Sequence, residues 1–464
     1  MSLRVTWVQP EDLVGHELRQ ATEDGRNAEA VATRWQKAGG HNAPSTAGAS
    51  QPPRPDLRPL ATALLDTLAT LPTPTTEDEP STFEAIRATP HPETRARTVR
   101  TGDPSLTREA LRARLHAAWL GRAVGCLLGK PVEKVGLGGI RALARAAGNW
   151  PLNNWFTARG VPAEVLDAHP WNRRSAATSL AENIDGMPED DDLNYPLLNL
   201  LLLQRYGRDF TTADVARLWL DELPAGRTFT AERVAYRNLL DGVEPPLTAT
   251  HRNPFREWIG ALIRADVHGW THPGDPLAAA EQAYRDASLT HTANGLYGAM
   301  FVAAALAAAA TGAADVHQSL AAGLRVIPPR SRLARAVRLG IETARATPDF
   351  DAVVDRLHAT LGGYHWVHAV PNAALLSAAL THADGDFTRS ICAAVSGGWD
   401  TDSNGATAGS LAGLLAGHPE RLPERWTSPL KNRLATSIPS FDGIGFDALA
   451  DLTAALALQE AVRP

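Results

Sequence analysis

Cysteine is nearly absent from this sequence, because the 464 residues include only Cys126 and Cys392. Two cysteines cannot build a disulfide framework, and without a CxxC pair they do not form a cysteine metal cluster. A basic surplus is missing as well, since 45 Lys and Arg residues stand against 51 Asp and Glu residues, for a net charge of −6. This balance argues against a nucleic-acid partner, which a basic surface would attract.

Long apolar runs are also lacking. No uninterrupted apolar segment approaches the ~18 to 20 residues needed to span a bilayer. The N-terminal segment MSLRVTWVQPEDLVGHEL lacks the apolar core of a signal peptide. The sequence therefore predicts a soluble, cytoplasmic protein without a membrane partner.

Strand-like alternation is rare from Leu106 onward, where long segments rich in Ala, Leu and Arg are separated by short Gly and Pro breaks. Segments 106–129 and 291–312 have the pattern of buried or amphipathic helices. No strand–helix repeat and no solenoid period are present. The sequence therefore predicts a single all-α, bundle-like domain over residues 105–464.

The first 104 residues have a different composition. A helix-like segment follows Asp12 and stops at Gly39 and Gly40, and a second short helix is predicted within residues 56–72. Pro- and Ser-rich runs typical of linkers follow each of them. We interpret residues 1–104 as an N-terminal extension, and the sequence leaves open whether its helices dock on the main body.

Near the C-terminus, the stretch SGGWDTDSNGATAGSLAGLLAG places Asp400, Asp402 and Ser403 among glycines. Residues two apart do not share a helix face, so these carboxylates can meet at one point only from a loop or a helix N-terminus. The helical run is predicted to begin after Asn404. From Gly405, glycine recurs at every fourth residue, which lets another helix approach closely. A simpler interpretation is a packing stripe behind an aspartate N-cap.

A second acidic cluster, residues 189–192, precedes an apolar helical stretch in which Pro196 fits the first turn. These acids can be explained as complements of the helix dipole or as a solvated charge run. Four successive acids repel one another, however, and a cation among them would explain the crowding. Hard divalent ions such as Mg²⁺ take oxygen ligands of this kind, and the absence of an EF-hand DxDxDG loop argues against calcium.

Four segments occur in order along the chain: GRAVGCLLGKPVE, the DDD run, ASLTHTANGLYGAMFVAAALAAA and GGWDTDSNGATAGSLAG. Together they resemble the ADP-ribosylglycohydrolase family, which includes the glycohydrolase that reactivates dinitrogenase reductase. The resemblance covers about residues 110–460. It implies an all-α fold with two Mg²⁺ ions in a central cleft, and Mn²⁺ suits the same ligands.

The resemblance also implies the metal ligands of the first acidic motif. The family's Thr-Asp-Asp-Thr sequence falls on Asp190, Asp191, Asp192 and Leu193, so the two central acids match. Asp190 keeps an oxygen ligand where the family has threonine and adds a negative charge. Leu193 keeps none.

The second motif of the family, Asp-Thr-Asp-Thr, falls on Asp400, Thr401, Asp402 and Ser403. Serine in the last position keeps a hydroxyl ligand. The resemblance therefore implies that Asp400, Asp402 and Ser403 share metal ions with the first motif, and that the nearby glycines let loop and substrate approach.

Acids outside these motifs are interpreted separately. Glu133, which follows three glycines at four-residue spacing, matches a glutamate that in the family faces substrate and metal. Alone it would be taken for a surface acid after a helix. Arg264 and Asp266 are expected to form a buried structural pair.

The segment THTANGLYG places His291, Asn294, Gly295 and Tyr297 where the family contacts the ribose and phosphates. The same residues have ordinary interpretations, because His291 can cap a helix and Tyr297 can be a core aromatic. The resemblance implies substrate binding, and the residues alone leave both interpretations open.

The loop GGYHWVHAVPN contributes His365 and Trp366, which could hold a base or a nicotinamide-like ring. The alternative is that Trp366 packs in the core, as most tryptophans do. Gly398, two residues before Asp400, is also predicted to bind substrate.

A mechanism follows from the chemistry and the resemblance together. Cleaving a ribosyl C1–N or C1–O bond develops oxocarbenium character, so the site must activate a water molecule. Metal ions could bind the ribose hydroxyls and lower the pKa of that water. Glu133, Asp191 and Asp192 are the candidate general bases, and they stay unresolved because acids that share a metal titrate together.

Three functions remain open. The first is a hydrolase that removes ADP-ribose from a modified protein, and the second is a hydrolase of a small NAD-derived or nucleoside-like riboside. The third is a non-catalytic relative that binds ADP-ribose. A lid formed by residues 1–104 would favour the small substrate, since a protein substrate needs an open cleft.

Overall fold

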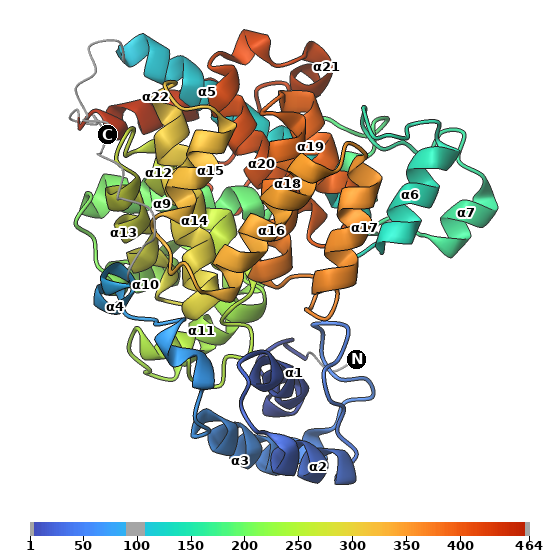
Figure 1. The fold of residues 1–464 in the computed structure, drawn as a ribbon, viewed down its shortest axis with the longest axis vertical. Coiled ribbons are helices and arrows are strands. Elements are labelled where there is room, and N and C mark those ends of the chain that lie inside the picture. The colour runs from blue at the N-terminus through green and yellow to red at the C-terminus, as the bar shows by residue number, and fades with distance from the viewer. Residues whose placement is uncertain (1–3, 90–106, 460–464) are drawn as a thin grey trace.

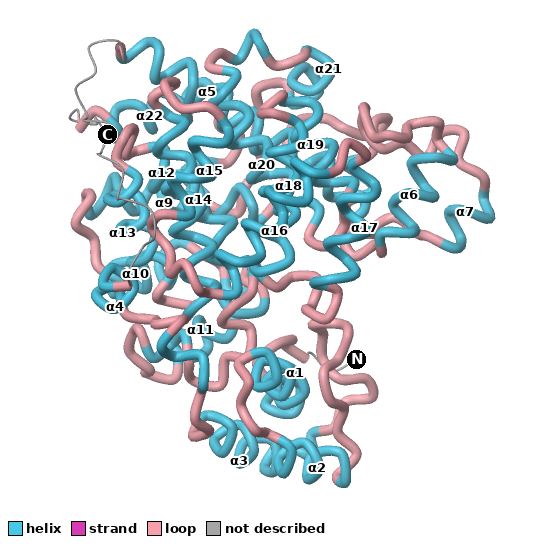
Figure 2. The backbone as a smooth tube through the Cα atoms, in the orientation of Figure 1, coloured by secondary structure: helices cyan, strands magenta, loops and turns pink. Residues whose placement is uncertain are grey.

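The structure is a computed structural model that describes residues 4–89 and 107–459, and it is built from helices. Within these ranges the chain forms no strand, and only two isolated bridges link extended residues, Met187 with Leu434 and Trp258 with His368. Figures 1 and 2 show the helices packed around one another, with loops mostly at the periphery. The predicted all-α fold is confirmed.

The extension contributes helices α1 to α4: Pro10–Glu23, Glu29–Lys37, Arg58–Ala69 and Phe83–Ala88. The main body contributes helices α5 to α22: Arg108–Gly129, Leu137–Ala146, Ala163–Ala168, Ala176–Ser179, Asp191–Tyr206, Thr212–Glu222, Thr230–Leu240, Asp266–Trp270, Pro276–Ala287, Ala293–Ala310, Val316–Leu324, Arg332–Ala346, Phe350–Leu361, Ala369–Ala383, Phe387–Ser396, Thr401–Ala416, Glu424–Thr427 and Phe446–Ala457.

The closest helix contact in the body joins α5 to α20. Glycines on the two helices face each other, Gly121 against Gly409 and Gly125 against Gly405, and a Cβ atom at any of these positions would overlap the backbone of the other helix. The four-residue spacing therefore serves the close approach that the sequence predicts. This contact brings the end of α5 to the beginning of α20.

The start of each acidic helix differs from the sequence prediction. Helix α20 begins at Thr401 rather than after Asn404, so Asp402 lies in its first turn. Helix α9 begins at Asp191, and Pro196 lies in its second turn rather than its first. The acids therefore form part of the helix starts and not only of the preceding loops.

Helix α14 is the most apolar helix of the core. Among the described residues it alone is long and apolar enough to cross a membrane by length and composition, and 94% of it is buried inside the protein. Its composition therefore fits the core helix of a folded domain, and it is longer than any apolar segment that the sequence predicts.

Helices α1, α2 and α3 of the extension form a lobe below the main body in Figure 1, while Phe83 of α4 packs against Tyr284 of α13 in the body. The predicted first helix of the extension is divided into α1 and α2, because Gly25 adopts a left-handed conformation with φ of 71°. Apolar residues of α1 and α3 pack together and against Phe255 and Trp258 of the body. The question that the sequence left open is thus answered, since the extension docks on the body.

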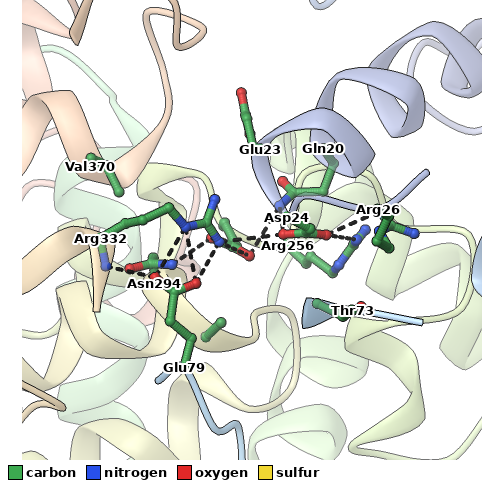
Figure 3. Close-up of polar contacts among 12 residues, drawn as sticks. Gln20, Glu23, Asp24, Arg26, Thr73, Glu79, Arg256, Asn294, Arg332 and Val370 are labelled. Atoms are coloured by element: carbon green, nitrogen blue, oxygen red, sulfur yellow. Dashed lines mark hydrogen bonds and ion pairs between the residues drawn. The ribbon is translucent and has the colours of Figure 1, made fainter. Parts of the chain in front are cut away.

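Charged side chains complete this interface (Figure 3). Arg332, at the start of α16, contacts Glu79 at 2.7 Å and Glu257 at 2.9 Å, and it reaches Asp24 of the extension at 3.4 Å. Arg256 pairs with Asp24 at 3.2 Å. These groups are largely buried, so each charge relies on its partners.

Candidate metal centre

The two acidic motifs lie at the starts of α9 and α20, beside the end of α5. Asp190 is the N-cap of α9, and its Oδ1 accepts a hydrogen bond from the Asp192 backbone N–H at 2.9 Å. The Thr401 hydroxyl at the start of α20 donates to the Gly129 carbonyl at 2.9 Å. The glycine-lined contact of α5 and α20 thus fixes the second motif next to the residues that follow α5.

Two positively charged side chains, Lys130 and Arg122, contact the first motif. The Lys130 Nζ donates to Asp190 Oδ2, and both side chains are 9% exposed. Burial alone would raise the pKa of Asp190, but the neighbouring ammonium prevails and the pKa of this carboxyl is lowered. The Arg122 guanidinium lies 3.5 Å from Asp192 Oδ1 and is fully buried.

Pro196 explains a further contact of Arg122. Proline has no N–H, so the Asp192 carbonyl four residues earlier lacks its usual helical partner. The Arg122 Nε donates to that carbonyl at 2.7 Å instead. The same guanidinium donates to Asp266 Oδ2 at 2.9 Å, so one side chain satisfies both the helix start and a buried carboxylate.

The second motif has neutral partners. The Asp400 backbone N–H donates to the Asn372 amide oxygen at 3.1 Å, and the Asn404 side chain donates to the same oxygen at 2.7 Å. No ion pair of Asp400 or Asp402 is present in the part of the chain that the structure describes. Burial and repulsion from nearby acids raise the pKa of Asp402 to about 7 and that of Asp400 well above its usual value.

Glu133 lies beyond the short turn that ends α5. Its Oε2 accepts a hydrogen bond from the Asn172 amide at 2.7 Å, and its Oε1 contacts the Lys134 Nζ at 2.6 Å. The side chain is 20% exposed, which is more than Asp400 or Asp402. Its charge contributes to the raised pKa of both Asp400 and Asp402.

These residues fit a hard divalent cation. Five carboxylates from two helix starts are joined by Glu133 and a serine hydroxyl, and burial together with mutual repulsion raises the pKa of Asp191 as well as Asp400 and Asp402. A cation would relieve this repulsion, and oxygen donors of this kind suit Mg²⁺ or Mn²⁺. Among the described residues, Cys126, Asp190 and Asp192 form the group of ligand atoms that all lie within 4.8 Å of one another.

The residues before the second motif were not singled out by the sequence analysis beyond Gly398. Both Gly398 and Trp399 have left-handed backbones, with φ of 79° and 54°. The His358 ring stacks on Trp399 with centroids 4.0 Å apart, and its Nε2 lies 2.8 Å from the Gly397 carbonyl. A left-handed tryptophan is strained, and the stack holds it in place. The Gly397–Gly398 pair was the only signal in the sequence.

Three of the predicted substrate-binding residues contact the interface with the extension instead of the acids. The Asn294 amide donates to Glu257 at 2.8 Å, while its oxygen accepts the Leu333 N–H at 2.8 Å. The backbone of Gly295 packs against the Arg256 carbonyl. The Tyr297 hydroxyl donates to the carbonyl of Pro80 in the extension. Their predicted role remains a prediction.

His291 is buried in a separate polar network. Its Nδ1 lies 2.6 Å from the Thr290 hydroxyl, and its Nε2 lies 3.9 Å from Glu232. Burial and the nearby Arg264 lower the pKa of His291 well below its usual value, so the ring is neutral. The predicted pair of Arg264 with Asp266 is wrong.

Arg264 instead pairs with Glu232 at 3.0 Å and Asp286 at 2.7 Å, and Asp266 pairs with Arg122. Arg264 and Asp266 are only two residues apart in sequence, but Arg264 ends a 3-10 segment and Asp266 begins α12. The two side chains therefore point to different partners.

The loop before α18 connects the extension to the second motif. His365 stacks on Trp258 with centroids 4.2 Å apart, and its Nε2 contacts the carbonyl of Ser45 in the extension at 3.1 Å. The Trp366 side chain packs partly buried against the core. Its carbonyl accepts from Asn372 at 2.8 Å, and Asn372 also receives the Asp400 N–H.

The chain belongs to the ADP-ribosylglycohydrolase family, whose model matches residues 107–462. The resemblance inferred from the sequence is therefore confirmed. This is a family of metal-dependent glycohydrolases of the ADP-ribosyl type.

Solved structures give a weaker likeness. One described as an ADP-ribosylglycohydrolase-related protein complex is similar at 19% identity, with a TM-score of 0.45, over 76% of this chain and 100% of its own. No curated protein matches the chain significantly.

Proposed function

We propose that this protein is a metal-dependent glycohydrolase that cleaves the C1 N- or O-glycosidic bond of an ADP-ribosyl or related ribosyl substrate. The observation that supports this most directly is that the acidic start of α20 lies beside the end of α5, where burial and repulsion among the acids, Glu133 included, raise the pKa of Asp191, Asp400 and Asp402. Such crowding is typical of a cation site.

Asp191, Asp400, Asp402 and Ser403 would hold the cation, with Mg²⁺ as the expected ion and Mn²⁺ as a substitute. A bound divalent ion would supply a site for the ribose hydroxyls and would lower the pKa of a nearby water. The resemblance implies two such ions.

The protein's own carboxylates differ in their access to substrate. Asp192 is 2% exposed and lies against Arg122 and the Cys126 thiol, which suits a supporting role. Asp191 and Glu133 retain partial exposure. We therefore favour Glu133 or Asp191 as the group that takes the proton from the attacking water, without a covalent intermediate.

Glu133 is also held in a defined orientation. The Asn172 amide and the Lys134 ammonium each bind one of its two oxygens. A carboxylate oriented in this way presents its remaining lone pairs in a fixed direction, as a general base requires.

A small riboside is the second candidate substrate, and the docked extension favours it. Residues that the family resemblance assigns to ribose and phosphate contacts, Asn294 and Tyr297, bind Glu257 and Pro80 in this structure. His365, assigned to the base, contacts Ser45. With these groups engaged, less of an ADP-ribosyl chain can be bound, and a shorter substrate fits better.

The experiment is release of free ribosyl product by the full chain from a panel, with Mg²⁺ or with EDTA. The panel contains an ADP-ribosyl-arginine peptide, an ADP-ribosyl-serine peptide, NAD and simple N-ribosides. Metal-dependent turnover of a peptide supports reversal of protein ADP-ribosylation, and turnover of ribosides alone supports the second candidate. No turnover together with ADP-ribose binding would overturn the proposal in favour of a non-catalytic binder.

A further inference from the structure

Lys130 is a buried lysine at the centre of the acidic cluster. It directly follows α5 in the turn Lys130–Val132 and is 7% exposed. Its Nζ donates to Asp190 Oδ2 and lies 3.3 Å from the Glu189 carbonyl. Lysine is almost never buried without a partner, so this position needs the acids around it.

Asp190 in turn has both of its oxygens occupied. Oδ1 caps α9 through the Asp192 N–H, and Oδ2 binds Lys130. Asp190 is thus held by one backbone donor and one cation.

The ion pair lies within a candidate group of metal ligands. Cys126, Asp190 and Asp192 form the group of ligand atoms within 4.8 Å of one another, and the Lys130 ammonium is bound to one member of it. A divalent ion would need ~2.0 to 2.1 Å contacts to the same oxygens if it were Mg²⁺. Two cations on one buried carboxylate repel each other strongly, because little water screens them.

We infer that Lys130 is the resident cation of the first acidic motif, and that the centre therefore binds one divalent ion instead of two. Asp190 is not a ligand of that ion, which is held by Asp191, Asp400 and Asp402. This inference rests on the metal site of the proposed function and specifies its composition.

The test measures bound metal without turnover. The full chain is freed of metal, titrated with Mn²⁺, and examined for stoichiometry by calorimetry and for spin coupling by electron paramagnetic resonance. We expect one Mn²⁺ per chain with the six-line spectrum of an isolated ion. Two ions per chain, or the spectrum of a coupled pair, would overturn the inference and leave the proposed function standing.

Lys130→Met removes the charge and keeps the length of the side chain, so it should admit a second Mn²⁺ with a coupled spectrum. Lys431→Met is the matched control, because Lys431 is an exposed lysine paired with Asp185. A stoichiometry of one in Lys130→Met would overturn the inference. If Lys130→Met does not fold, the Mn²⁺ stoichiometry of the wild-type protein tests the inference alone. Wild-type protein that binds no Mn²⁺ would overturn both this inference and the metal site of the proposed function.

Discussion

The starts of α9 and α20 place acids in the same local setting but surround them differently. Asp190 and Asp192 at the first start are bound by Lys130 and Arg122. Asp400 at the second start has the Asn372 amide as its backbone partner, and no cation is paired with it in the described residues. Asp190 at the first start is thus compensated, while burial and neighbouring acids raise the pKa of Asp191, Asp192, Asp400 and Asp402.

This difference indicates a division of roles. A carboxylate that caps a helix and binds a lysine contributes to the fold, because its charge is already satisfied. Carboxylates that raise one another's pKa destabilise the folded protein until a cation binds between them. The second start, which has no cationic partner among the described residues, therefore depends most on the metal, and Asp191 of the first start shares this dependence.

The largest effect is expected when the second start loses its charges. Asp400→Asn combined with Asp402→Asn should reduce metal-dependent turnover by at least ~10³-fold, because the ion loses two of its carboxylate ligands. Product release from the best substrate of the panel measures this, with far-ultraviolet circular dichroism to check the fold.

Asp384→Asn is the matched control for that double variant, since Asp384 is 80% exposed and pairs only with His317 in the described contacts. It should retain wild-type turnover. Turnover that survives in the double variant would remove the metal model altogether.

Arg122→Met tests whether the first start depends on its cations for folding. The change leaves the buried Asp192 and Asp266 carboxylates without their guanidinium, and the Asp192 carbonyl without a donor. Removing one partner of a buried ion pair costs about 3 to 5 kcal/mol of unfolding free energy. Denaturant unfolding of the metal-free protein measures it.

Arg217→Met is the control, because Arg217 is 63% exposed and pairs with Asp214 on the same helix. Its change in unfolding free energy should stay within about 0.5 kcal/mol. Equal losses of unfolding free energy in Arg122→Met and Arg217→Met would mean that the ion pairs of Arg122 do not stabilise the fold.

Local patterns predicted the parts of this molecule that depend on neighbours in sequence. Glycine at every fourth position of α20 predicted a close helix contact, and α5 supplies the matching glycines. The acids before each helix predicted two oxygen-rich helix starts. These features follow from helix geometry and from the chemistry of the residues themselves.

Contacts between distant residues could not be predicted in the same way. Arg122 binds Asp192 and Asp266, which are 70 and 144 residues away along the chain. The prediction that Arg264 pairs with Asp266 is wrong for the same reason. Closeness in sequence does not determine which side chains the packing of helices brings together. The docking of the extension likewise depends on Arg332 meeting Asp24 across 308 residues.

Gly125→Ala tests how the two starts are held together. Its Cβ would overlap the Gly405 carbonyl, so α5 and α20 must separate. We expect a loss of about 3 kcal/mol of unfolding free energy and weaker Mn²⁺ binding, since the second start would move relative to Asp191. Gly138→Ala is the control, because that helical glycine has open space around it. If Gly125→Ala is destabilised but its Mn²⁺ affinity is unchanged, the contact of α5 with α20 stabilises the fold without positioning the metal ligands.

The smallest effect concerns stability without metal. The pKa of Asp402 is raised from 3.8 to about 7 in the folded state, so the fold keeps a proton that the unfolded chain has lost between these values. Stability from this group therefore falls as pH rises from about 4 to 7, and its loss is complete above pH 7. Asp402→Asn should make the metal-free protein more stable than wild type at pH 8 by about 2 kcal/mol, with a smaller difference at pH 5.

Added Mn²⁺ should reverse this order, because it stabilises wild type in proportion to its binding and the variant much less. Asp209→Asn, at an exposed position, is the control and should follow wild type under every condition. Thermal unfolding at pH 5 and pH 8, each with and without Mn²⁺, provides the measurement. If Asp402→Asn is destabilised without metal at pH 8, the second start is compensated by contacts other than those of Asn372, and the contrast between the two helix starts fails.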